Sequence, residues 1–189
     1  MTDYPELVFP SPDEWEVWLR DHHAQADGVW LKVAKKGSGI PSITHAGALD
    51  VALCYGWIDG QARGIDETWY LQKFTPRRAR SLWSKRNRDK VAALIESGRM
   101  EPAGLREIER AKADGRWDAA YDGPAAATVP DDLRAALDAT PAAATFFETL
   151  SGQNRYAILH RVQTAKKPET RARRIAQFVE MLARGETLY

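Results

Sequence analysis

The sequence is poor in several features that would by themselves define a class of protein. Its 189 residues contain a single cysteine, Cys54, which excludes an internal disulfide and a zinc site built from cysteines. No stretch approaches the ~18 apolar residues of a membrane helix, and the acidic N-terminal residues 1–6 lack the apolar core of a signal peptide. We therefore expect a cytoplasmic protein that has no membrane span and keeps Cys54 as a buried thiol.

The sequence also lacks the short motifs that identify common enzymes. It contains neither a Gly-x-Ser-x-Gly motif nor a dinucleotide-binding fingerprint, and Lys35–Gly39 has only part of a phosphate-loop pattern. The histidines do not have the spacing of metal ligands. We therefore predict no cofactor and no metal site, and whether the chain is an enzyme stays open.

What is present is an ordinary globular composition with an uneven distribution of charge. Apolar residues make up 44% of the chain and charged residues 28%, and the net charge is only +1. Residues 1–60 hold 4 basic and 9 acidic groups, residues 61–117 hold 14 and 8, and residues 118–189 hold 9 and 9. The basic middle segment is therefore where an anionic partner would be expected.

The first part of the chain alternates between helix and strand signals. A capping box at Ser11 begins a helix that ends near residue 22, and Thr44 caps a second helix. Between them, residues 28–36 alternate as a strand does. Residues 56–60 begin a further strand that returns over 68–74 as a hairpin.

The rest of the chain is helical, apart from one interruption. Residues 84–97 and 102–115 predict two helices, and residues 118–129 form a linker rich in Ala, Gly, Pro and Asp. All seven tryptophans precede this linker. The sequence thus predicts an α+β protein: a small mixed, Trp-rich unit over 1–117 with a β-hairpin and helices, then an all-helical C-terminal segment over 130–189 that docks on it.

The strongest local signal is the basic stretch Lys73–Lys90, which holds eight basic residues and one acid. Its cations cluster where a helix begins, and free amides at a helix N-terminus attract anions. Arg77 or Arg78 can grip a carboxylate or phosphate in a bidentate manner, and Trp83 can stack on a flat group. Ser84 and Asn87 would orient the ligand.

A second signal is the segment Tyr55–Gln61, in which two glycines bracket Trp57 and Asp59. Asp59 at a strand start could act as a general acid or base, hold a cation or pair with an arginine. The predicted binding site joins both segments, with Asp59 as its weak catalytic candidate: Trp57, Asp59, Arg77, Arg78, Trp83, Ser84 and Asn87.

Several interpretations of these residues stay open. The basic stretch could be a solvated loop that pairs with acids, Asp59 could form a structural salt bridge, and Trp57 could belong to the core. If the residues form a site, it could bind a small anion, serve an enzyme acting on a small anionic substrate with Asp59 as acid or base, or bind single-stranded nucleic acid. The last needs a stacking platform of basic and aromatic residues, for which the hairpin and the basic stretch offer Trp69, Tyr70, Phe74 and Trp83. It fits less well, because the domain is not strongly basic and matches no recognition motif.

Four segments resemble the bacterial YdeI/OmpD-associated proteins, also called bacteriocin-protection proteins. They are Gly56-Trp-Ile-Asp-Gly60, Phe74-Thr-Pro-Arg-Arg78, Ser81-Leu-Trp-Ser-Lys-Arg-Asn87 and Ala165-Lys-Lys-Pro-Glu-Thr-Arg-Ala-Arg-Arg174. The resemblance implies a role in resistance to bacteriocins or cationic antimicrobial peptides and association with an outer-membrane porin. It supplies no catalytic residues.

Taken together, these observations predict a non-enzymatic binding or stress-protection protein with an anion-binding patch. Its expected partners are a small anionic ligand and, as a further option, a protein. A peptide-binding role for the C-terminal helices would require an exposed apolar groove.

Overall fold

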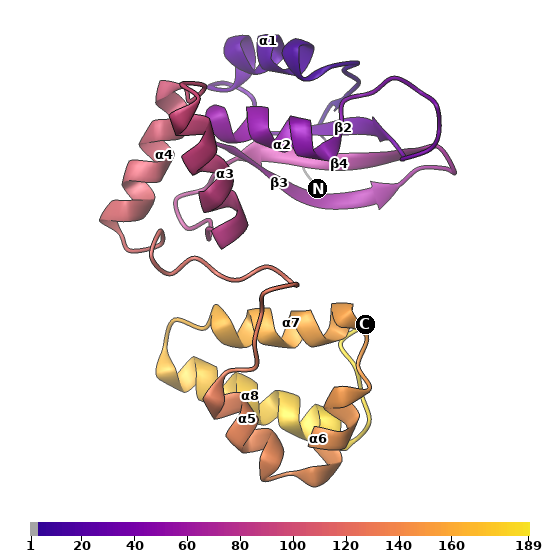
Figure 1. Cartoon of the computed structure of the whole chain (residues 1–189), viewed down its shortest axis with the longest axis vertical. Coiled ribbons are helices and arrows are strands. Elements are labelled where there is room, and N and C mark those ends of the chain that lie inside the picture. Colours follow the sequence, from indigo (N-terminus) through magenta and orange to yellow (C-terminus); the bar gives the residue numbers. More distant parts are fainter. Residues whose placement is uncertain (1–3) are drawn as a thin grey trace. The chain divides into compact units, whose positions relative to one another are not determined.

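The computed structural model describes residues 4–189, so Met1, Thr2 and Asp3 of the acidic N-terminal stretch lie outside the described residues. The chain divides into two compact units. Unit 1 extends to Trp83 and includes Asn87–Ala119, whereas unit 2 comprises Ser84–Arg86 and Ala120–Tyr189. Unit 1 contains a mixed sheet with helices and unit 2 is built from helices, which confirms the predicted α+β class (Figure 1).

The sheet of unit 1 has four strands in the order β1-β2-β4-β3. The predicted hairpin is confirmed, since β3 (Trp57–Gly64) pairs antiparallel with β4 (Trp69–Pro76). β4 also pairs antiparallel with β2 (Val29–Ala34), and it continues two residues beyond the predicted end at Phe74. The parallel edge strand β1 (Glu6–Leu7) was not predicted, because two residues are too few to show an alternating pattern.

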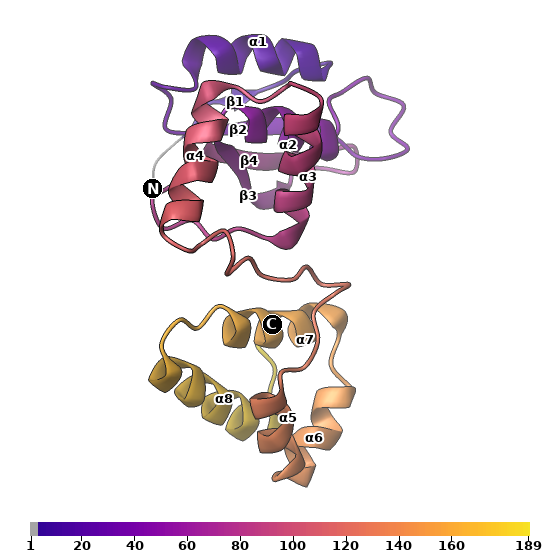
Figure 2. The same cartoon turned by 60° about the vertical axis from the view of Figure 1, so that its left-hand side comes forward.

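Helices α1 (Pro12–His22) and α2 (His45–Cys54) cover one face of this sheet (Figure 1). Both begin at the predicted caps: Ser11 accepts a hydrogen bond from the amide of Glu14, and Thr44 accepts one from the amide of Gly47. Helices α3 (Lys85–Glu96) and α4 (Pro102–Ala113) lie at one end of the sheet (Figure 2).

The core of unit 1 is centred on Trp15, which is fully buried. Its ring stacks on Trp18 at 5.3 Å between centroids and meets Trp57 edge-on at 6.2 Å and Phe74 at 5.8 Å. The indole N–H of Trp15 donates to the carbonyl of Ala48 at 3.1 Å, so its one polar atom is satisfied inside the core. One side chain thus joins α1, α2 and the sheet.

Two glycines allow α4 to approach the end of α2. Gly56 has a φ of +74°, and a Cβ atom on it would lie 3.0 Å from the carbonyl oxygen of Ala103. Gly104 faces the end of α2 so closely that a Cβ atom would lie within 3.0 Å of the carbonyl oxygens of Leu53 and Cys54. The first glycine of the Gly56–Gly60 motif is therefore fixed by backbone geometry.

Unit 2 contains α5 (Asp131–Asp138), α6 (Pro141–Glu148), α7 (Gly152–Gln163) and α8 (Pro168–Ala183). Helix α8 contacts each of the other three. Their inward faces form one apolar core: Leu133, Leu137, Ala143, Phe147, Ile158, Leu159, Val162, Ile175, Phe178 and Leu182. Among residues 4–189, no helix combines the length and the apolar character that a membrane crossing requires.

Replacing Gly104 by alanine should change the stability of unit 1 in the direction opposite to that usual for a glycine in a helix. Replacing a glycine inside a helix by alanine normally stabilises a protein by about 1 kcal/mol. Gly104→Ala should instead destabilise unit 1 by about 2 kcal/mol or more, because the new methyl group meets backbone atoms that cannot turn away. Urea unfolding followed by tryptophan fluorescence measures this. Gly64→Ala is the control, since its methyl group meets nothing within 4 Å, and a destabilisation equal to that of the control would refute the proposed contact.

We propose that residues 1–117 and 130–189 are separate domains, and the position of the tryptophans provides a test. All seven lie in unit 1, so their fluorescence reports unit 1 alone, whereas circular dichroism also reports α5–α8. Leu182→Ala removes a fully buried side chain from unit 2 at a cost of about 3 kcal/mol. We expect it to shift the dichroism transition and leave the fluorescence transition unchanged. Equal shifts of both signals would mean that the chain unfolds as one cooperative unit.

Candidate functional site

Asp59 lies on β3 opposite Phe74 and forms a hydrogen bond with a histidine. Its Oδ2 atom is 3.0 Å from Nε2 of His45, the first residue of α2. The side chains of Asp59 and His45 are 28% and 31% exposed. Because an ionised carboxylate only accepts hydrogen bonds, His45 places its proton on Nε2. The pair therefore joins the start of α2 to the sheet, and it leaves about a quarter of the Asp59 side chain open to solvent.

Trp57 is almost completely buried and belongs to the aromatic core of unit 1. It contacts Trp15 and Trp18 edge-on, and its indole N–H donates to the carbonyl of His23 at 3.2 Å. Its ring is thus used in packing the core.

Arg77 is the most buried basic residue of the stretch Lys73–Lys90, with only 6% of its surface exposed. Its guanidinium carbon lies 3.6 Å from the centroid of the Trp83 ring, and Nη1 donates to the carbonyl of Leu82 at 3.2 Å. Trp83 in turn meets Trp117 at 4.9 Å, and Arg88 lies 5.1 Å from the Trp117 ring. This arginine–tryptophan stack joins the loop after β4 to α3 and to the segment after α4.

The remaining predicted residues differ in exposure. Ser84 and Asn87 are buried, and Ser84 pairs with Tyr121 as an isolated β-bridge. Arg78 is exposed, and its amide donates to the hydroxyl of Ser81. The sheet brings the backbones of the two predicted segments together, since the amide of Arg77 donates to the carbonyl of Gly56. Their polar groups have different partners: Asp59 contacts His45, and Arg77 contacts Trp83.

A hollow of about 320 Å³ opens beside the end of β4. Two arginines and one acid lie among its lining residues: Tyr4, Asp27, Thr75, Pro76, Arg77 and Arg78. Both arginines of the predicted anion contact therefore line one cavity. Asp27 places a negative charge in the same hollow and weakens its attraction for an anion.

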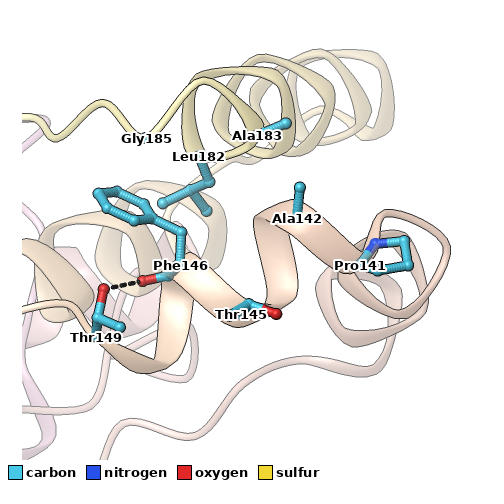
Figure 3. Close-up of a pocket in the computed structure, with 8 residues that line it drawn as sticks. All are labelled: Pro141, Ala142, Thr145, Phe146, Thr149, Leu182, Ala183 and Gly185. Atoms are coloured by element: carbon cyan, nitrogen blue, oxygen red, sulfur yellow. Dashed lines mark hydrogen bonds between the residues drawn. The ribbon is translucent and has the colours of Figure 1, made fainter.

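A second hollow, of about 470 Å³, lies between α6 and the end of α8 (Figure 3). Phe146 is directed toward Leu182 and Gly185, and the methyl group of Ala142 points toward α8. The lining is mostly apolar with a few hydroxyl groups: Pro141, Ala142, Thr145, Phe146, Thr149, Leu182, Ala183 and Gly185. We call it the α6–α8 groove. Most of these residues are exposed, so the groove is an open apolar surface.

Exposed carboxylates lie close to this groove along the chain. Glu148 ends α6, Glu180 lies one turn before the groove residue Ala183, and Glu186 follows Gly185. Arg184 binds both Glu180 and Glu186, which lowers the pKa of the Glu186 carboxyl group. With Glu148 paired to Arg155 at 3.3 Å, three carboxylates thus share two arginines.

The structure gives no sign of chemistry at Cys54 or of a metal site among the described residues. Burial raises the pKa of the Cys54 thiol to about 11, and the thiol donates to the carbonyl of Asp50, as expected for a buried structural cysteine. In the described part of the chain, no three His, Cys, Asp or Glu side chains are grouped as metal ligands would be. Sequence reasoning missed the α6–α8 groove, because the alanines and glycine that line it carry no chemical signal.

Each part of the chain matches a different family model. Residues 7–107 match the family model described as a domain of unknown function, DUF8412. Residues 126–185 match the model described as bacteriocin-protection, YdeI or OmpD-associated. The search of curated proteins found no match, and neither did the search of solved structures. The chain belongs to the DUF8412 family, whose model matches more than half of it, and residues 126–185 of its helical part are similar to the bacteriocin-protection family. Of the four segments that resemble that family in the sequence, only Ala165–Arg174 lies within the matched range.

Proposed function

We propose that this protein protects against cationic antimicrobial peptides by binding them directly, without catalysis, in the α6–α8 groove. The observation that carries the proposal is the position of the groove: its residues, 141–185, lie inside the range that matches the bacteriocin-protection family. This is the exposed apolar groove that a peptide-binding role for these helices requires.

The lining of the groove suits the apolar face of a helical peptide. Small side chains at Ala142, Ala183 and Gly185 leave room, while the half-buried Phe146, which packs over the buried Leu182, provides apolar surface (Figure 3). A volume of about 470 Å³ accommodates several aliphatic side chains of a ligand. Burial of apolar surface of both partners would supply most of the affinity.

The nearby carboxylates suit the charge of such a peptide. Glu148, Glu180 and Glu186 are exposed, and the two arginines that pair with them leave an excess of negative charge. Lysine residues of a peptide would pair with these carboxylates, which are close to the groove residues along the chain. Electrostatic complementarity of this kind raises association rates and selects cationic over anionic peptides.

A charge placed in the groove should weaken this binding. We expect Ala183→Lys to weaken the binding of a labelled amphipathic cationic peptide by about tenfold, because it blocks the apolar lining and repels the ligand. Fluorescence anisotropy at two salt concentrations measures the affinity. Gln177→Lys adds the same charge at another exposed position of α8 and should change the affinity less than twofold. Equal effects of both variants, or no binding by the wild type, would contradict the proposal.

A second candidate function is the binding of a small anion in unit 1, and the hollow lined by Arg77 and Arg78 favours it. Arg77 is held in place by Trp83 and Leu82, so its guanidinium is preorganised. Arg78 is exposed and can close on a bound carboxylate or phosphate. Trp83 supports this candidate by holding Arg77, whereas a role of Ser84 and Asn87 in orienting the ligand stays a prediction.

Charge reversal at the exposed arginine tests the second candidate. Arg78→Glu should reduce the binding of phosphate, measured by calorimetry at low salt, by at least tenfold. Arg80→Glu is the control, because Arg80 is exposed on the same loop but does not line the hollow. Asp27→Asn removes the repelling carboxylate and should tighten binding. If Arg78→Glu and Arg80→Glu have the same effect, the hollow is no specific site.

The other functions considered from the sequence have weaker support. The contact with His45 gives Asp59 a structural role, and an enzymatic role for Asp59 stays a hypothesis. Binding of single-stranded nucleic acid needs free ring faces, whereas Trp69 is covered by Lys32 at 4.7 Å and Trp83 by Arg77. The cytoplasmic location and the association with a porin also stay predictions.

A further inference from the structure

We propose that unit 2 contains a binding site for a small organic phosphate, formed by Arg161, Arg174 and His160 between α7 and α8. These residues line a hollow of about 480 Å³, together with Gln153, Tyr156 and Thr164. The site is distinct from the α6–α8 groove and does not depend on the peptide-binding function, because the two hollows share no residue.

Within the described residues, the two arginines are held by uncharged oxygen atoms and not by carboxylates. Arg161 donates to the carbonyl of Ala157 and to the hydroxyl of Tyr189, both at 3.2 Å, and Arg174 donates to the carbonyl of Arg161. Among the ion pairs of residues 4–189 neither arginine takes part. These contacts fix the guanidinium groups while using only part of their five N–H donors each.

The neighbouring Arg171 of α8, unlike Arg174, is paired with a carboxylate. It binds Asp132 with two hydrogen bonds, of 2.6 and 2.8 Å, and this pairing lowers the pKa of the Asp132 carboxyl group. Arg171 is thus a neutralised structural group, whereas Arg174, one turn further along the helix, lines the hollow. The contrast separates a structural arginine from one that can accept an anionic ligand.

The pKa of His160 reflects the electrostatic environment of the hollow. Burial is the main cause that lowers its pKa, and the positive charges of Arg161 and Arg174 lower it further. Tyr121 and Tyr156 also face the imidazole ring, at 4.6 and 5.7 Å between centroids. The nearby Asp122 carboxylate is held by Lys85 and Gln163. At neutral pH the ring is therefore uncharged, and an anion beside it would favour its protonation.

The chemistry of the lining selects the class of ligand. Two guanidinium groups, an imidazole and the amide of Gln153 supply donors for the several oxygens of a phosphate group. Tyr156 and Ala157 provide apolar surface for an organic part, and the volume suits a molecule larger than free phosphate. Free phosphate shares the charge but leaves the apolar surface uncovered.

Phenyl phosphate and inorganic phosphate are the probes for this site, and the NMR signal of His160 is the readout. We expect phenyl phosphate to bind at least tenfold more tightly than inorganic phosphate and to raise the pKa of His160. Arg174→Gln should weaken binding by at least tenfold. Arg173→Gln removes the same charge from an exposed neighbouring position of α8 and should change affinity less than twofold.

Phenyl sulfate, whose charge is constant between about pH 5 and 8, isolates the proton linkage. Its affinity should rise as the pH falls through the His160 pKa, because a bound anion stabilises the protonated ring, and a rise of one pKa unit corresponds to tenfold. His160→Gln should remove this pH dependence and retain binding by the arginines. Equal binding of both phosphates would reassign the site to free phosphate and overturn the organic class. Equal losses in Arg173→Gln and Arg174→Gln, or an unchanged His160 signal, would overturn the site itself.

Discussion

The structure of unit 1 depends on the burial of one side chain, Trp15, between two helices and the sheet. The ring contacts of Trp15 with Trp57 and Phe74 tie α1 to both strands of the hairpin, and its hydrogen bond to Ala48 ties it to α2. Large aromatic side chains bury much apolar area for each ordered residue, which matters in a unit of this size. The abundance of tryptophan in this part of the chain is therefore explained by packing, and it also fixes the hairpin whose ends position Asp59 and Arg77.

Arginines in and near the basic stretch stabilise the fold through internal hydrogen bonds. The loop after β4 has no regular structure, so its carbonyl groups need donors from elsewhere. Arg77 donates to Leu82, and Arg116 donates to Ser81 at 2.9 Å while its other side binds Asp114. Much of the positive charge seen in the sequence is thus used inside the molecule. Among the cations of the stretch that stay exposed, Arg78 lines the hollow beside β4.

Local signals in the sequence predicted the helices and the hairpin, because caps, turns and periodic apolar residues act within a few positions of the chain. Ser11 and Thr44 are examples, since each bonds an amide three residues away. The burial of Arg77 could not be predicted in this way. It depends on Trp83 and, through it, on Trp117, which lies 40 residues further along the chain. The α6–α8 groove was equally hidden, because a groove is a shape formed by two helices and its alanines have no distinctive chemistry.

The net charge of the C-terminal part of the sequence does not reveal the charged sites that its residues form in the structure. Residues 118–189 hold 9 basic and 9 acidic groups, which predicts no preference for any partner. In the structure Arg171 and Arg184 are paired with carboxylates, whereas Arg161 and Arg174 are held by uncharged oxygen atoms. Arg161 of α7 and Arg174 of α8 therefore place two cations between these helices, whereas two carboxylates, Glu180 and Glu186, share Arg184 at the end of α8. The net charge of zero thus conceals a local positive charge between α7 and α8 and a local negative charge at the end of α8. Each can attract a ligand of opposite charge, because screening in water limits the reach of a surface charge to about 8 Å at physiological salt.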